Sequence, residues 1–134
     1  MESAKVIFFD RKKFYGFARI VTFAQGKIII WPQEILFHLG RGYKMKEGRD
    51  KPKFNYKQKL KKIPQIGEYL VFVRKKSGNK NLRDKASVWG LRSQYKEIWR
   101  RIDRTKRQQK QRQKLEQVFH LIEKENFQET RKAL

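Results

Sequence analysis

The sequence predicts a mainly β protein with an α-helical extension, in which a five-stranded antiparallel barrel is followed by a long basic helix. Residues 1–91 contain short segments of β-branched and aromatic residues separated by turn residues. Residues 91–134 contain neither glycine nor proline and are rich in helix formers. We therefore expect two parts, a barrel over residues 1–91 and a basic helical extension over residues 92–134.

The five strands are predicted from composition and from the turns between them. In chain order the segments are AKVIFFD (4–10), FYGFARIVTF (14–23), IIIW with EILFHL (28–31 and 34–39), GEYLVFVRKK (67–76) and KASVWGL (85–91). Each is rich in residues that strands favour. A charged turn joins the first two segments, and a hairpin turn at Gly26 follows the second. Pro32 stops or offsets the ladder because it has no N–H to donate, and SGNKN (77–81) is expected to be a loop.

Two blocks carry most of the positive charge. Residues 40–62 hold ten Lys or Arg and two acidic residues, and residues 96–114 hold nine and two. The first block contains Gly and Pro and has no clear period, so we expect a long basic loop there, with one helical turn at YKQKLKK (56–62). The last segment, 115–134, holds three Lys or Arg and four acidic residues.

The extension has apolar residues at helical spacing near each end. Tyr95, Ile98 and Trp99 begin one such stripe, and Leu115 and Ile122 bound another. Between them, the segment 103–114 has no apolar residue, so a hydrophobic core cannot hold a helix along that span. Three alternatives stay open: one long helix, a helix that frays in solution, and a bend near 105–113 that makes a helical hairpin.

The charge balance points to a polyanionic partner. There are 35 Lys or Arg against 13 Asp or Glu, a formal net charge of +22, and nucleic acid is the polyanion whose closely spaced phosphates best neutralise such a charge. An anionic membrane fits less well, since no apolar run approaches the roughly 18 residues of a membrane span. We expect no signal peptide and a cytoplasmic location. Cysteine is absent, which excludes disulfides and thiolate metal sites.

One face of the predicted sheet combines rings and cations. Side chains alternate along a strand, so Tyr15, Phe17 and Arg19 share a face, and Leu36 and His38 have the same spacing. Exposure of aromatic rings to water is unfavourable unless something flat covers them, and unstacked bases can do so. The opposite, core-facing side is expected to be formed by Ala18, Ile20, Phe37, Val71 and Val73.

These segments resemble the cold-shock domain, an oligonucleotide-binding OB-type barrel of five strands. KVIFFDRKKFYGFARI (5–20) is similar to its first two strands and first ribonucleoprotein-type motif, where the family typically reads Val-Lys-Trp-Phe-Asn and then Lys-Gly-Phe-Gly-Phe-Ile. The positions that agree are Val6, Phe9, Lys13, Gly16 and Phe17, with Phe8 at the Trp place and Tyr15 at the first Phe place. ILFHL (35–39) resembles the second motif, Val-Phe-Val-His-Phe, with His38 aligned. GEYLVFV and KASVWG resemble the fourth and fifth strands, so the likeness covers roughly residues 4–91.

The resemblance implies binding of single-stranded RNA or DNA through Phe8, Lys13, Tyr15, Phe17 and His38. The sequence also departs from the family. Phe14 replaces a glycine, and Leu36 and Leu39 replace two stacking phenylalanines, so we expect weaker stacking on the third strand and a larger share of affinity from charge. The connections 21–34 and 40–62 are longer than is usual in the family. The resemblance also does not account for the helical extension.

The ring-bearing face and the basic blocks together give the predicted nucleic-acid-binding residues. They are Phe8, Lys13, Tyr15, Phe17, Arg19, His38, Arg41, Lys44, Lys57, Lys59, Arg100, Arg101, Arg104, Arg107, Lys110 and Arg112. We expect no metal and no cofactor.

The function that these features favour is a non-catalytic RNA-binding protein associated with ribosomes or translation. A barrel, a basic loop and a basic helix suit a protein laid into folded RNA. The alternatives are a free cold-shock-type RNA chaperone and a single-stranded DNA-binding protein, and RNA is not distinguished from DNA. The segment 115–127 is a candidate helix for binding a protein partner.

Enzyme activity is not expected. Metal-dependent nucleases need clustered carboxylates, and the few acidic residues of the barrel segment are scattered along the sequence without forming such a cluster. His38 and His120 are the only histidines, and GRG (40–42) lacks the lysine and the spacing of a phosphate-binding loop.

Overall fold

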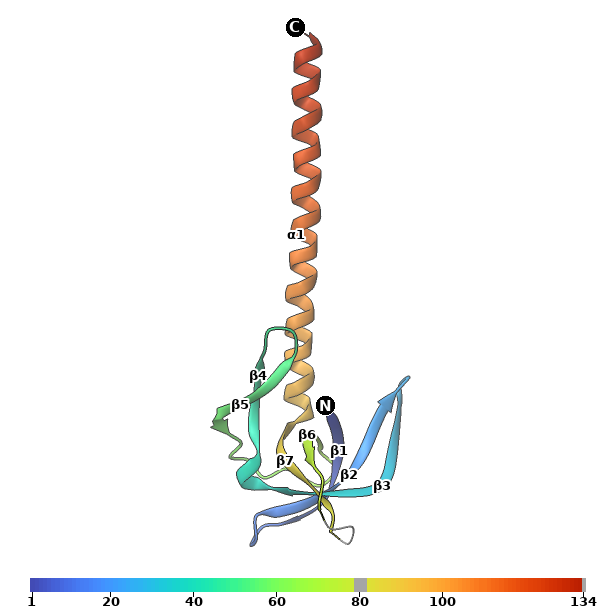
Figure 1. Cartoon of the computed structure of the whole chain (residues 1–134), viewed down its shortest axis with the longest axis vertical. Coiled ribbons are helices and arrows are strands. Elements are labelled where there is room, and N and C mark those ends of the chain that lie inside the picture. The colour runs from blue at the N-terminus through green and yellow to red at the C-terminus, as the bar shows by residue number, and fades with distance from the viewer. Residues whose placement is uncertain (79–81, 134) are drawn as a thin grey trace. The chain divides into compact units, whose positions relative to one another are not determined.

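The structure, a computed structural model, describes the backbone of residues 1–78 and 82–133 and the side chains of residues 1–78 and 82–122. It consists of two compact units, Met1–Trp99 and Arg100–Leu134. The first unit holds a closed five-stranded barrel and a separate two-stranded sheet (Figure 1). The barrel strands are β1 (Glu2–Asp10), β2 (Tyr15–Ala24), β3 (Lys27–His38), β6 (Tyr69–Lys75) and β7 (Asp84–Leu91).

The barrel closes in the order β1-β2-β3-β7-β6, with β6 pairing back onto β1. Among the described strands one barrel pair is parallel, β3 with β7, where Ile35 and Leu36 lie beside Asp84 and Lys85. Parallel neighbours need a long connection, and the chain between these two strands is long enough to include β6 and the small sheet. The predicted barrel with a helical extension is confirmed, with one parallel pair where we expected only antiparallel ones. This strand order is consistent with an OB-like fold.

The core lies inside the barrel and is built from alternate residues of its strands. Ala18 and Ile20 of β2 face inward as predicted, together with Phe37 of β3. On β6, however, Leu70 and Phe72 join this core cluster, whereas Val73 is 45% exposed. The expectation for Val73 was wrong because four apolar residues follow one another here, so the sequence has no alternation from which the inner face could be chosen.

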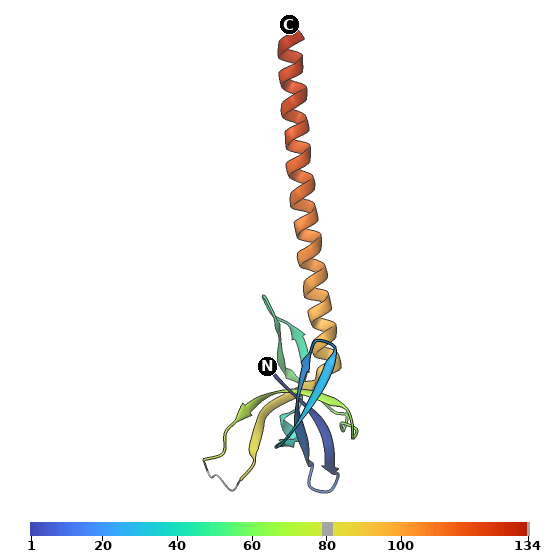
Figure 2. The same cartoon turned by 90° about the vertical axis from the view of Figure 1, so that its right-hand side faces the viewer.

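Strands β2 and β3 form a long hairpin that extends beyond the barrel (Figure 2). The predicted turn is confirmed: Gln25 and Gly26 both have positive φ, 48° and 73°, as a two-residue hairpin loop requires. IIIW and EILFHL form the single strand β3, and the pairing with β2 shifts register opposite Pro32. Pro32 therefore offsets the ladder without ending the strand.

The basic block 40–62 is not a loop. It forms the end of a short 3-10 helix, η1 (Leu39–Arg41), followed by β4 (Tyr43–Glu47) and β5 (Pro52–Lys59), which pair as an antiparallel hairpin. The expected helical turn at 56–62 is also wrong, since β5 occupies most of it. Met45 and Phe54 are buried while the lysines beside them are exposed. Buried and exposed residues thus alternate as in a strand, but the exposed residues are lysines, whose low strand propensity argued against a strand.

The extension is one helix, α1 (Arg92–Ala133), which begins at the predicted boundary and has no bend over 105–113. Its first two turns belong to the barrel unit. There the Gln94 side-chain oxygen accepts a hydrogen bond from the Met45 N–H at 3.2 Å, and Arg92 Nη1 donates to Ser3 Oγ at 2.7 Å. Arg92 also lies 3.8 Å from the centre of the Phe23 ring, and burial lowers the pKa of its guanidinium. Because α1 continues without a break through residues 105–113, the hairpin alternative for the extension is wrong.

Candidate nucleic-acid interface

Four of the predicted residues form one cluster of rings on the outside of the barrel, which we call the aromatic face: Phe8, Tyr15, Phe17 and His38. The ring centres of Phe8 and Phe17 lie 5.9 Å apart in a stacked arrangement, and those of Tyr15 and Phe17 lie 5.7 Å apart. His38 lies 6.2 Å from Tyr15. Phe8 is 44% exposed, and Tyr15 and Phe17 are half-buried, so none of the three is a core residue.

Strand pairing brings these rings together. Phe17 lies beside Phe8 of β1 and Leu36 of β3, and Tyr15 lies beside His38. Val6 and Phe8 are two residues apart, so an unbroken strand would point both inward. The register between β1 and β2 shifts between them, and this bulge leaves Val6 fully buried while Phe8 faces solvent.

The aromatic face borders a groove of about 650 Å³. Its lining adds residues to the predicted ones: Leu36, Leu82, Arg83 and Lys85. The Arg83 guanidinium carbon lies 4.3 Å from the centre of the Phe17 ring, and Arg83 also pairs with Glu34 at 3.0 Å. Sequence reasoning missed Arg83 and Lys85. The sequence shows two cations at the start of the last strand, which could have marked them as candidates. Only the parallel pairing of β7 with β3 places them beside the aromatic face.

Three other predicted residues, Arg19, Lys13 and Arg41, do not line the groove at the aromatic face. Arg19 is exposed on the same strand, but its Nε lies 3.9 Å from Glu34 and it does not line the groove. Lys13 is exposed in the turn between β1 and β2, where its backbone N–H donates to Asp10 at 3.3 Å. Arg41 is exposed in η1. Leu39, which the resemblance placed among the stacking positions, packs against the core cluster.

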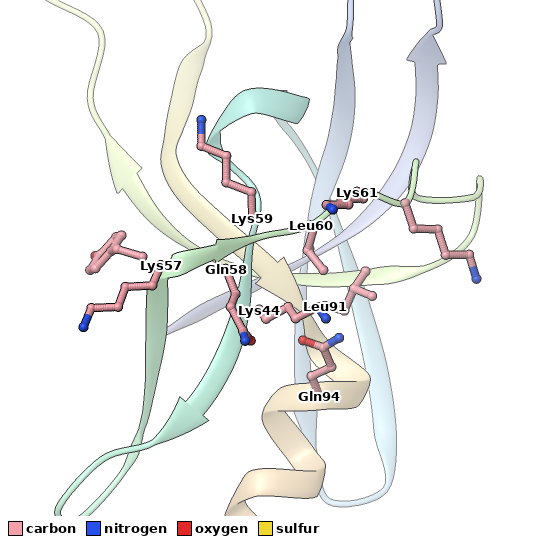
Figure 3. A pocket seen from close by; sticks show the side chains of 10 residues that line it. Lys44, Lys57, Gln58, Lys59, Leu60, Lys61, Leu91 and Gln94 are labelled. Atoms are coloured by element: carbon pink, nitrogen blue, oxygen red, sulfur yellow. The ribbon is translucent and has the colours of Figure 1, made fainter.

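Three predicted lysines, Lys44, Lys57 and Lys59, line a different groove of about 770 Å³ (Figure 3). We call it the lysine groove. Its lining also includes Lys61, Lys62 and Tyr56, which were not singled out from the sequence. Because we expected a loop over residues 40–62, we had no reason to predict which of its lysines would lie together in one groove.

The predicted helix residues are exposed along α1 in the second unit. They are Arg100, Arg101, Arg104, Arg107, Lys110 and Arg112. Arg100, Arg104 and Arg107 have the spacing of one helix face. The partner-helix segment 115–127 begins with exposed Leu115, Val118 and Phe119, and its side chains from 123 onward lie outside the described residues.

Two further observations concern metal binding and membrane spans in the described part of the chain. No group of three or more His, Cys, Asp or Glu side chains there is placed to hold a metal ion. None of its helices combines the length with the apolar character that crossing a membrane requires.

Comparisons with protein-family models, with curated proteins and with solved structures each gave no match.

Proposed function

We propose that this chain is a non-catalytic RNA-binding protein of the cold-shock type, which stacks unpaired bases on its aromatic face. The supporting observation is that Phe8, Tyr15 and Phe17 contact one another on the outside of the barrel instead of packing into its core. Each base that stacks on such a ring contributes about 1–3 kcal/mol. The rings are already grouped, so little ordering opposes binding.

Cations around the rings would hold the phosphates of the stacked strand. Arg83 covers one edge of the ring cluster, and Lys85 lines the same groove. Lys13 and Arg41 are exposed in the adjoining turn and 3-10 helix. This combination of rings with positive charge is the usual design of a surface that binds single strands with little sequence preference.

The test of base stacking is the double variant Tyr15→Ala with Phe17→Ala. We expect its affinity for an unstructured six-nucleotide RNA to fall about 30-fold or more, which corresponds to at least about 1 kcal/mol for each ring removed. Fluorescence anisotropy measures the affinity, and circular dichroism checks that the barrel is intact. Trp31→Ala is the matched control, because Trp31 is 48% exposed and does not line the groove. Equal losses in both variants would contradict the proposal.

We further propose that the protein works in association with ribosomes or translation. This rests on the net charge of +22 and on the exposed cations along α1, which exceed what a short single strand can neutralise. The exposed apolar residues at the start of the segment 115–127 are a candidate contact for a protein partner there. Sedimentation of the endogenous protein with ribosomes through a sucrose gradient tests this association.

The second candidate is a free RNA chaperone or a single-stranded DNA-binding protein. The aromatic face favours it, because stacking on exposed rings needs no other part of the chain and does not distinguish ribose from deoxyribose. Protein that stays at the top of the gradient, and binds RNA and DNA oligonucleotides equally, would favour this candidate.

A further inference from the structure

The lysine groove is separate from the aromatic face. It lies between the β4–β5 hairpin, the segment after β5 and the first turn of α1, and it is lined by Lys44, Lys57, Lys59, Lys61 and Lys62 with Tyr56, Gln58, Leu60, Leu91 and Gln94. Figure 3 shows Leu60, Leu91 and Gln94 in the middle of the view, with Lys57 and Lys59 extending outward from them. No residue lines both this groove and the groove at the aromatic face.

The walls of the lysine groove are held in place by the barrel. Leu60 is buried in the core cluster, and its N–H donates to the Gly42 carbonyl at 3.0 Å. Met45 is tied to Gln94 by a hydrogen bond of 3.2 Å. Gly90 of β7 leaves room for Met45, because a Cβ on that glycine would lie 2.8 Å from the Met45 sulfur. The hairpin is therefore fixed to the barrel, and its lysines start from defined positions.

The charge of the lysine groove is uncompensated. Its lining includes five lysines and no carboxylate. None of the five groove lysines takes part in the ion pairs that Arg19, Arg74 and Arg83 form with acidic residues elsewhere in the described part of the chain. Five like charges around one groove repel one another unless an anion lies among them.

The lining favours phosphates over bases. Lysine ammonium groups are compact point charges that bind phosphate without reading base edges. Tyr56 is the one aromatic residue of the lining. A sugar–phosphate backbone therefore fits this groove better than a run of stacked bases does.

The distance between the two grooves follows from β7. Lys85 lines the groove at the aromatic face and Leu91 lines the lysine groove, and both belong to this strand. Six residues of strand span about 20 Å at roughly 3.3 Å per residue. A stacked polynucleotide strand covers that distance in about six nucleotides at 3.4 Å each, and an extended strand covers it in fewer.

We propose that the lysine groove is a second subsite, which binds the backbone of the same RNA strand whose bases stack on the aromatic face. This inference rests on the proposed function. Once bases are held at the aromatic face, the lysine groove meets the backbone at a high effective concentration. A strand of about six nucleotides that stacks several bases on the aromatic face has fewer left than the about six stacked nucleotides that this distance needs, whereas a strand of about twelve reaches both subsites.

The test is a length series of oligouridylate, 6, 8, 12 and 16 nucleotides long, measured by fluorescence anisotropy. For the unchanged protein we expect affinity to rise at least 10-fold between 6 and 12 nucleotides. The variant Lys57→Gln with Lys59→Gln should bind the 6-mer unchanged and lose most of that rise. Its salt slope for the 12-mer should be shallower by about 1.4, since each single-strand phosphate contact contributes about 0.7.

The matched control is Lys46→Gln with Lys53→Gln. These two exposed lysines lie opposite each other on the same hairpin but outside the lining of the lysine groove. In the control variant, affinity should still rise at least 10-fold between 6 and 12 nucleotides. Circular dichroism checks the fold of both variants. If the control loses as much as the groove variant, general charge explains the effect and the subsite is overturned.

The experiment also separates this inference from the proposed function. A 6-mer that binds through Tyr15 and Phe17, with no gain at 12 nucleotides, would overturn the second subsite and leave the proposed function standing. Failure to bind oligonucleotides of any length would contradict the proposed function itself.

Discussion

Gly16 separates the rings of Tyr15 and Phe17 for a steric reason. It is buried beneath the aromatic face, between β1 and β3. A Cβ at this position would meet the Phe8 carbonyl oxygen and would lie 2.7 Å from Cζ of Phe37. The glycine therefore lets the exposed ring cluster and the core lie on opposite sides of one thin strand.

We expect Gly16→Ala to destabilise the protein by about 1–3 kcal/mol, because the added methyl group overpacks the barrel wall. Urea unfolding followed by circular dichroism measures the change. Gly40→Ala is the control, since a Cβ there meets nothing within 4 Å, and its effect should stay within about 0.5 kcal/mol. Equal effects in both variants would show that the wall at Gly16 can move aside.

Phe14 occupies a backbone position that favours glycine. Its φ is 57°, in the left-handed region, and its ring is 56% exposed. The backbone holds it there, because the Phe14 N–H donates to Asp10 and the Phe14 carbonyl accepts from Leu39, both at 2.9 Å. The strain at this turn therefore lies in the φ angle of Phe14, whose ring is exposed.

We expect Phe14→Gly to leave the free energy of unfolding unchanged or to raise it by up to about 1.5 kcal/mol. Relief of the left-handed conformation gains about 1–2 kcal/mol, and the greater freedom of glycine in the unfolded chain offsets about 0.5–1 kcal/mol of this. Phe14→Val should be destabilising, because β-branched residues tolerate positive φ poorly. Thermal unfolding of the two variants side by side measures both effects, and a less stable glycine variant would contradict the account.

At the scale of elements, the β4–β5 hairpin shows why a basic segment is hard to interpret. Apolar and basic residues alternate along YKMKE, with Met45 buried and its neighbours exposed. This period of two covers only five residues, and the lysines, glycines and the single proline around it leave the block 40–62 without a clear period. The buried residues contact β7 and the start of α1, so tertiary packing overrides the low strand propensity of lysine.

The first two turns of α1 contribute more to the packing of the barrel unit than the rest of the helix does. Arg92, Gln94 and Ile98 lie in the barrel unit, where they are hydrogen-bonded or buried. From Arg100 onward the helix belongs to the second unit, in which Ile102 is still buried, whereas every residue from Asp103 to the end of the described side chains at Ile122 is exposed. A truncation after Trp99 therefore preserves the barrel better than one at Arg92.

We expect the chain truncated after Trp99 to keep the affinity of the full chain for a six-nucleotide RNA, because the aromatic face lies within residues 1–99. Its binding to large structured RNA, and its sedimentation with ribosomes, should fall strongly, since the exposed arginines of α1 are removed. Anisotropy and gradient sedimentation measure the two effects. A truncated protein that still sediments with ribosomes as the full chain does would contradict the role of the helix.

At the scale of the whole molecule, charge decides which partners are favoured. The 35 Lys and Arg residues far outnumber the 13 Asp and Glu residues, so the excess positive charges repel one another in the free protein. A polyanion relieves this repulsion and releases its own counterions on binding. Affinity for RNA should therefore depend steeply on salt, and more steeply for longer RNA.

We expect the logarithm of the association constant for a 16-nucleotide RNA to fall with the logarithm of salt concentration with a slope of about −4. This corresponds to about six phosphates neutralised at roughly 0.7 each. For the six-nucleotide RNA the slope should be about half as steep. Anisotropy titrations between 50 and 400 mM KCl measure both slopes, and two shallow, equal slopes would contradict the charge-based account.

The sequence by itself determined the barrel with its helical extension, the start of the helix at Arg92 and the outward position of Tyr15 and Phe17. These features follow from local rules: strand alternation, turn residues, and the loss of Gly and Pro after Gly90. Only the tertiary structure decided that a bulge points Phe8 outward, that β7 brings Arg83 to Phe17, and that five lysines gather in one groove. Each of these depends on how separate segments pair and pack against one another, which the spacing of residues within one segment does not specify.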